Sequence, residues 1–136
     1  MILNNTIELQ SYGDNRGRIS IAEIGKEIPF DVKRIYYLTN LSDSKPRGFH
    51  AHRELRQLAI CIEGSCRMLL DDGVDKSVVA MDSPTLGVLI EPMVWHEMHD
   101  FSDGCVFLVL ASDIYNEQDY IRDYSEFIDH KGKDSK

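Results

Sequence analysis

Two histidines, His50 and His52, stand two positions apart in a segment that is typical of a β-strand. Residues two apart on a strand point to the same side, so both imidazoles are expected to face one cavity, with Phe49 and Ala51 on the other side. Imidazoles change charge near neutral pH and also bind metal ions. The pair therefore predicts acid/base catalysis or a metal site. The alternative is that both histidines lie on a solvated face and have no function.

The surroundings of this pair and a second short segment form a pattern. In segment 48–64 the pair is followed by Gln57, and segment 87–96 ends with His96 but carries Met93 three positions earlier. These segments resemble the two cupin motifs, with Gln57 at the usual place of a glutamate ligand and Met93 at that of a glycine. The resemblance implies a jelly-roll fold.

The glutamine at position 57 bears on the choice between metal and acid/base chemistry. A neutral amide is a poorer ligand than a carboxylate for hard or borderline divalent cations, and it does not offset their charge. Three histidines alone can still hold zinc, as they do in carbonic anhydrase. We expect no metal or other cofactor, and histidines that act as acid/base groups.

Six ordered segments carry a more specific pattern. They are Val32-Lys-Arg-Ile-Tyr-Tyr, Pro46-Arg-Gly-Phe-His-Ala-His, Gly64-Ser-Cys-Arg, Leu70-Asp-Asp-Gly, Trp95-His-Glu-Met-His-Asp-Phe and Leu110-Ala-Ser-Asp-Ile-Tyr. Together they resemble the dTDP-4-keto-6-deoxyglucose 3,4-ketoisomerases, over nearly the whole chain. The resemblance implies a metal-free dimer that moves a sugar carbonyl from C4 to C3 through an enediol. Its products lead to 3-amino-3,6-dideoxyhexoses of surface glycans such as lipopolysaccharide or S-layer glycan.

The resemblance also implies roles for residues that titrate. His50 and His52 are the expected catalytic pair, because proton transfer at C3 and C4 needs groups that titrate near neutral pH. A third proton donor is expected from Tyr36 or Tyr37, which point to opposite sides of one strand. The resemblance favours Tyr37.

Further residues are expected to bind the substrate, a dTDP-linked 4-keto-6-deoxyhexose. His96 is placed inward against the sugar, whereas His99 falls on the opposite side of its strand. Arg18, Arg34 and Arg47 lie in strand-like segments, and guanidinium groups bind phosphate oxygens in pairs. Arg18 and His96 also resemble the branch of the family whose product has the galacto configuration at C4.

The elements that must position these residues are short strand-like runs between turn signals. Runs at 18–22, 32–39, 48–52, 58–62, 65–70, 76–81, 87–90, 94–99 and 105–111 predict an all-β antiparallel sandwich or barrel. A helical stripe of apolar residues then predicts a C-terminal helix, capped by Asn116 and containing Tyr120, Ile121, Tyr124, Phe127 and Ile128. Residues from about 129 to 136 are polar and are expected to form a flexible tail.

The composition limits the remaining possibilities. The 136 residues predict one domain, 1–136, and a net charge of −8 opposes a nucleic-acid-binding surface. No apolar run is long enough to span a membrane, and the N-terminus lacks a signal-peptide pattern, so a cytoplasmic protein is expected. The three cysteines, Cys61, Cys66 and Cys105, lack CxxC spacing and indicate buried thiols rather than a zinc or disulfide framework.

The sequence thus predicts a cytoplasmic sugar-nucleotide ketoisomerase that forms a homodimer through exposed strand edges and the apolar stripe of its helix. Two alternatives stay open. One is a 3,5-epimerase that acts on a related dTDP-sugar, and the other is a cupin that binds a sugar without catalysis.

Overall fold

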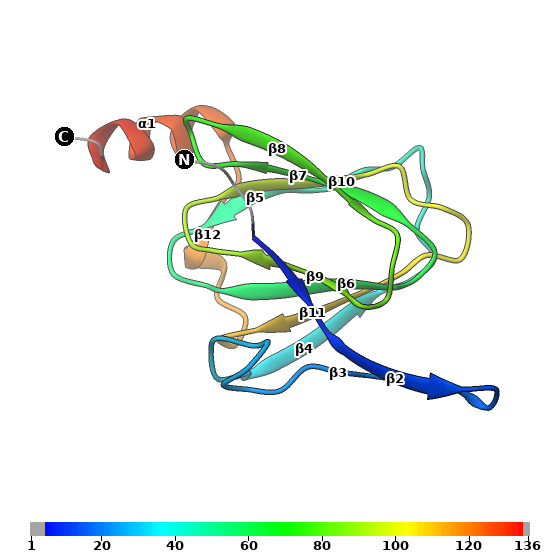
Figure 1. The fold of residues 1–136 in the computed structure, drawn as a ribbon. Coiled ribbons are helices and arrows are strands. Elements are labelled where there is room, and N and C mark those ends of the chain that lie inside the picture. The colour runs from blue at the N-terminus through cyan, green and yellow to red at the C-terminus, as the bar shows by residue number, and fades with distance from the viewer. Residues whose placement is uncertain (1–4, 135–136) are drawn as a thin grey trace.

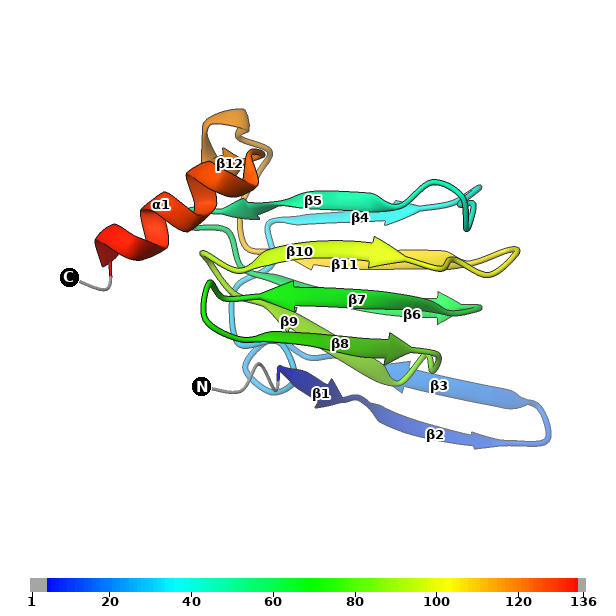
Figure 2. The ribbon, with the colours of Figure 1, turned by 90° about the horizontal axis from the view of Figure 1, so that it is seen from above.

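Two antiparallel sheets face each other in the computed structural model, which describes residues 5–134 and their side chains through residue 132. One five-stranded sheet has the order β1 (Thr6–Glu8), β9 (Leu86–Ile90), β6 (Gln57–Glu63), β11 (Val106–Ala111) and β4 (Arg34–Leu38). The other has the order β12 (Tyr120–Ile121), β5 (Arg47–His52), β10 (Trp95–His99), β7 (Cys66–Asp71) and β8 (Lys76–Met81). Figure 1 shows the two layers one above the other, and Figure 2 looks down on the second sheet.

The alternation of side chains along the strands builds the core between these sheets. On β7, Cys66, Met68 and Leu70 are buried, whereas Arg67 between them is exposed. The same buried cluster takes up Phe107 and Val109 from β11 in the facing sheet. Burial of apolar surface between two layers of strands is the main stabilising contribution in such a fold. The predicted all-β architecture of cupin type is confirmed.

A hairpin of β2 (Gln10–Asp14) and β3 (Gly17–Ile21) forms a separate two-stranded sheet that projects from the body of the molecule (Figures 1 and 2). Its turn uses a positive φ of 131° at Gly17, a backbone conformation that glycine adopts without steric cost. Tyr12 and Ile19 are 58% and 60% exposed. The predicted strand near 18–22 is present, but it lies on an arm and not against the core.

The C-terminal segment differs from the predicted continuous helix. Asn116 caps a short 3-10 helix (Glu117–Asp119), and the chain then forms β12, whose Tyr120 pairs with His52 of β5. The prediction of one continuous helix was wrong because the backbone of Tyr120 and Ile121 pairs with the edge of β5 that would otherwise be open. Ile121 thereby becomes buried beside Ala51.

The helix α1 (Tyr124–Asp134) begins only after this strand. Asp123 caps it by accepting the amides of Ser125 and Glu126. Phe127 is fully buried against Trp95, as the apolar stripe predicts. The helix continues through Asp134, where a tail was expected from about residue 129, and residues 135–136 lie outside the described part. Within residues 5–134 no helix is long and apolar enough to cross a membrane.

Candidate active site

Three imidazoles meet at the centre of the second sheet. His50 and His52 come from β5 and His96 from its antiparallel neighbour β10, where His96 pairs with His50. The ring centroids of His50 lie 4.9 Å from His52 and 4.5 Å from His96, and those of His52 and His96 are 6.0 Å apart. Ala51 is buried on the opposite face of β5, against Trp95. The predicted orientation of the histidine pair is therefore present, and His96 joins it.

A distortion of β5 lies immediately before the pair. Gly48 and Phe49 have positive φ values of 94° and 60°, and the pairing register shifts between His96 and Glu97. A Cβ at position 48 would lie 2.9 Å from the carbonyl oxygen of His96, so only glycine fits. A phenylalanine in this conformation costs about 1–3 kcal/mol.

The ring of Phe49 rests edge-on against His99, with centroids 5.6 Å apart. His99 is in turn held by Glu97, 2.8 Å from Nε2. This support on the outer face of the sheet offsets the backbone strain where β5 turns, immediately before His50 and His52. His99 thus lies on the opposite side from His96, as the alternation predicts.

All three histidines use Nδ1 as a donor. Nδ1 of His50 and of His96 lies 3.0 Å and 3.4 Å from the carbonyl oxygen two positions earlier in the chain. Nδ1 of His52 lies 3.0 Å from Oδ2 of Asp119. Carbonyl and carboxylate oxygens only accept, so each Nδ1 carries the proton and each Nε2 keeps a lone pair. Such an arrangement can accept protons or bind a metal ion.

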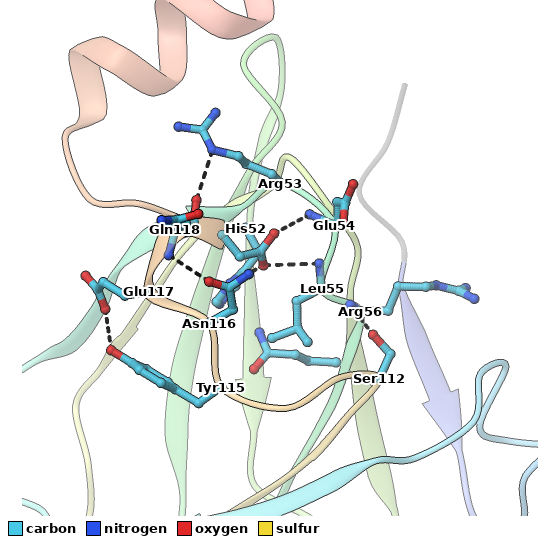
Figure 3. Close-up of polar contacts among 12 residues, drawn as sticks. His52, Arg53, Glu54, Leu55, Arg56, Ser112, Tyr115, Asn116, Glu117 and Gln118 are labelled. Carbon is cyan, nitrogen blue, oxygen red and sulfur yellow. Dashed lines mark hydrogen bonds and ion pairs between the residues drawn. The ribbon is translucent and has the colours of Figure 1, made fainter.

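Asp119 is itself held firmly. Its Oδ1 accepts the backbone amide of Glu54 at 2.8 Å, and its Oδ2 accepts that of Leu55 at 3.3 Å. Figure 3 shows how the loop after β5 and the loop after β11 join there, with Arg53 reaching Gln118 and Arg56 contacting Ser112. The carboxylate is therefore oriented before it meets His52.

Burial sets the protonation of the site. It lowers the pKa of His50 to about 4, helped by the neighbouring His52, and it lowers the pKa of His96 well below its ordinary value. Burial also lowers the pKa of His52, against the opposing effect of the Asp119 carboxylate. At neutral pH the imidazoles are neutral and can act as bases.

The open side of this cluster is a cavity of about 350 Å³. Its lining comprises Arg34, Tyr36, Leu38, Arg47, Gly48, His50, His96, Met98, Tyr120 and Arg122. A second cavity of about 220 Å³ lies against His52 and Asp119 and shares Arg34 and Tyr120 with the first. His52 therefore stands between the first cavity and the loops that carry its carboxylate.

The tyrosine in the cavity is Tyr36, not Tyr37, which corrects the expected orientation. Tyr37 is 66% exposed on the outer face of β4. The reason is the register with β11, which sets Tyr36 opposite the buried Val109 and turns both side chains inward. The hydroxyl of Tyr36 donates to Oε1 of Gln57 at 2.5 Å, and burial raises the pKa of Tyr36 to about 12.

Gln57 decides how well the cluster would suit a metal ion. The three histidines have ligand nitrogens within 4.8 Å of one another, so they could hold a metal ion. Gln57 is buried, its oxygen accepts from Tyr36, and its Nε2 has no partner among the described residues. A neutral amide whose oxygen is already bound to Tyr36 is a poor additional ligand for a cation.

Three arginines line the first cavity. Arg34 and Arg47 were predicted, and Arg122 was not. The side chain of Arg34 stacks on Tyr36 at 5.3 Å, and its buried Nε has no partner among the described residues. Arg122 lies 4.1 Å from the ring centroid of Tyr120 and pairs with Glu117. Guanidinium groups so placed can bind a phosphate or diphosphate.

Arg18 is not among them, and its expected place beside the sugar pocket stays a prediction. It lies on the β2–β3 hairpin, where its Nε donates to Ser11 Oγ at 3.1 Å. The local pattern around residue 18 identified a strand correctly, but it held no information about which sheet the strand joins.

Asp119, Tyr120 and Arg122 were missed as site residues. All three fall in the segment that the apolar stripe assigned to a helix, which hid their place beside β5. The adjacent Tyr120 and Ile121 are aromatic and β-branched, and this signal of a short strand could have found them.

Comparison with known proteins agrees with this arrangement. The family model FdtA, described as "WxcM-like, C-terminal", matches residues 4–132. The chain is 49% identical over 124 residues to a TDP-4-oxo-6-deoxy-alpha-D-glucose-3,4-oxoisomerase of Aneurinibacillus thermoaerophilus, covering 91% of this chain and 89% of the relative.

Two solved structures are similarly close. A 3,4-ketoisomerase from Helicobacter canadensis has a TM-score of 0.90 and 44% identity, covering 93% of this chain and 96% of that one. A mutant of the QdtA 3,4-ketoisomerase from Thermoanaerobacterium thermosaccharolyticum, in complex with TDP-4-keto-6-deoxyglucose, has a TM-score of 0.92 and 40% identity, covering 97% of each chain. By the extent of these matches and the cupin-type fold that they share, the chain belongs to the FdtA family of WxcM-like, C-terminal proteins.

Proposed function

We propose that this chain is an isomerase that converts dTDP-4-keto-6-deoxy-D-glucose into a dTDP-3-keto-6-deoxyhexose. The observation that carries the proposal is the cavity with neutral His50 and His96, the protonated Tyr36 and three arginines, with His52 directly behind it. The family relatives that are named 3,4-ketoisomerases support the same substrate class.

The reaction consists of two steps, each with one proton transfer at carbon and one at oxygen. A base removes the proton at C3, which the neighbouring C4 ketone acidifies, while O4 gains a proton and an enediol forms. A proton is then added at C4 and the proton on O3 is lost, which leaves the ketone at C3. A group that accepts a proton must be unprotonated at the working pH, and a group that donates one must be protonated.

His50 suits the proton transfer at carbon. It lines the first cavity, and its pKa of about 4 keeps Nε2 free to accept a proton at neutral pH. No proton needs to leave this imidazole before the reaction begins.

His52 suits the transfers between O4 and O3. The Asp119 carboxylate on its Nδ1 stabilises the protonated imidazole, so this histidine can hold a proton briefly and return it. Tyr36, oriented by Gln57, adds a hydroxyl donor from the facing sheet. His96 is proposed to contact the sugar.

Arg34 and Arg47 are proposed to hold the diphosphate, together with Arg122. The first cavity has no carboxylate in its described lining, and Glu117 offsets the charge of Arg122 alone, so Arg34 and Arg47 give the cavity a positive potential despite the acidic net charge of the chain. The unpartnered Nε of Arg34 gives one donor that a phosphate oxygen can satisfy.

The proposal is tested by adding dTDP-4-keto-6-deoxyglucose in D₂O and following the product by NMR. We expect a C3 ketone with deuterium at C4, and the galacto configuration at C4 is predicted. His50→Asn or His52→Asn should lower kcat by about 10²–10⁴-fold, because each removes one acid/base group. Nucleotide affinity should change little.

The same experiment separates the alternatives. A ketone that stays at C4 while the configuration at C3 or C5 changes would indicate an epimerase. Binding without any turnover would indicate a sugar-binding cupin. We propose that no metal takes part, so turnover should be the same after prolonged chelation, and loss of activity that one added metal restores would contradict this.

Tyr36 and Tyr37 provide a matched pair of variants. Tyr36→Phe removes the hydroxyl in the cavity and should lower kcat by about 10²-fold or more. Tyr37→Phe changes an exposed hydroxyl and should leave kcat unchanged. Steady-state kinetics of both variants check this, and the reverse order of effects would assign the donor to Tyr37.

Asp119→Asn tests the positioning of His52. Asp119 stabilises protonated His52, so its loss should lower the pKa of His52 further and move the acidic limb of the pH–rate profile to lower pH. At neutral pH, kcat should fall because the imidazolium that forms during turnover loses its partner.

Asp113→Asn is the matched control, since Asp113 lies in the same loop and its Oδ1 accepts the amide of Ile114. It should leave both kcat and the acidic limb unchanged. An Asp119→Asn enzyme with lower kcat but an unshifted pH profile would assign Asp119 a structural role only.

A homodimer is proposed from the exposed apolar side chains of the projecting hairpin, Tyr12 and Ile19. An arm that leaves its own core is suited to pack on a second copy, and Arg18 could then approach that copy's cavity. Light scattering should give twice the 15.6 kDa chain mass at micromolar concentration. Ile19→Asp should shift the particle to a monomer, whereas Val74→Asp, at an 86% exposed site on another loop, should not.

A further inference from the structure

Three cysteines meet at the end of the barrel away from α1, outside the site described above. Cys61 lies near the end of β6, Cys66 begins β7, and Cys105 directly precedes β11. Their sulfur atoms all lie within 4.8 Å of one another, and those of Cys61 and Cys105 are 3.4 Å apart. All three are free thiols with at most 2% of their surface exposed.

Two connected turns hold this cluster in place. The amide of Ser65 donates to Ser102 Oγ at 2.8 Å, and the amide of Ser102 donates to the Ser65 carbonyl at 2.9 Å. Gly64, with a positive φ of 77°, lets the turns close, because a Cβ there would lie 3.0 Å from the Cα of Cys105. In Figure 2 the turn between β6 and β7 and the loop between β10 and β11 lie at the same end of the barrel.

The surroundings of the sulfurs are apolar. The same buried cluster contains Met68, Met81, Phe101 and Phe107. Among the described residues, the metal-ligating group at this place consists of the three cysteines alone. Thiolates in such a setting select soft ions. Structural zinc sites have four protein ligands, and catalytic zinc completes its three protein ligands with a water, so an apolar group of three sulfurs suits neither.

The number of sulfur atoms points to a monovalent ion. Three sulfurs within 4.8 Å of one another can surround Cu(I), which prefers soft thiolate ligands and accepts three of them. When such an ion displaces one thiol proton, the net charge of the group does not change, and a net charge in an apolar core is costly.

We propose that Cys61, Cys66 and Cys105 form a three-sulfur binding site for a soft monovalent cation of the Cu(I) class, separate from the histidine cluster. Binding forms copper–sulfur bonds and breaks one S–H bond, whose proton passes to solvent. Copper stays in the +1 state, so no electron is transferred.

The test is an anaerobic titration of the reduced, full-length protein with Cu(I) against a chromogenic Cu(I) chelator. We expect one Cu(I) per chain, with an affinity that rises about tenfold per pH unit because one proton is released. X-ray absorption at the copper edge should show a shell of sulfur atoms. Zn(II) should bind far more weakly, since a fourth ligand is missing.

Variants assign the site. Cys66→Ala should weaken Cu(I) binding by more than about 10-fold, since even loss of a group behind a ligand has an effect of that size. His96→Asn is the control for the second cluster and should bind Cu(I) as the unmodified chain does. Circular dichroism reports whether Cys66→Ala folds. If this variant does not fold, X-ray absorption of the unmodified protein with bound copper shows whether sulfur atoms are the ligands.

Three results with copper would overturn the proposal. The unmodified chain could fail to withdraw Cu(I) from the chelator. X-ray absorption could show nitrogen atoms rather than sulfur atoms around the copper. Cu(I) binding could survive in Cys66→Ala but be lost in His96→Asn. Equal affinity for Zn(II) would also contradict it.

Discussion

The position of β5 between two partner strands is the constraint on which the site depends. β10 pairs with one of its edges and β12 with the other, so His50 and His52 meet His96 on one side and the Asp119–Tyr120 segment on the other. The bulge at Gly48 and Phe49 sets the angle at which the histidines enter this arrangement. A strand with two free edges could not hold three rings and a carboxylate in register.

Burial and hydrogen bonding oppose each other at these histidines, and the balance differs among them. His96 is enclosed and has only a backbone carbonyl at its Nδ1, so its pKa lies well below the ordinary value. His52 has the Asp119 carboxylate, which limits the lowering. Imidazoles of different basicity, with ring centroids 4.5–6.0 Å apart, can pass protons over short distances.

The barrel carries its two clusters of reactive side chains in different surroundings. The histidines face a cavity with arginines and a tyrosine, where a polar ligand can satisfy the free Nε donor of Arg34. The cysteines lie among methionine and phenylalanine side chains, where a charged ligand would be poorly solvated. The same fold therefore offers polar acid/base chemistry in one place and soft-ligand chemistry in the other.

The sequence by itself determined what depends on neighbouring positions along the chain. Alternation predicted most of the core strands, and the spacing of two placed His50 and His52 on one side, because the direction of side chains along a strand repeats every second residue. The resemblance to the ketoisomerases, carried by ordered segments, predicted the family and with it the cupin-type fold.

Only the tertiary structure decided what depends on pairing between distant segments. Alternation showed that Tyr36 and Tyr37 point apart, but the register with β11 was needed to tell which one faces the core. Asp119 reaches His52 across 67 positions of sequence, and Tyr120–Ile121 became a strand because β5 offered an unpaired edge. Arg18 lies on the separate β2–β3 hairpin for the same physical reason: local periodicity sets relative directions, whereas the sheet that a strand joins is set by contacts with the rest of the fold.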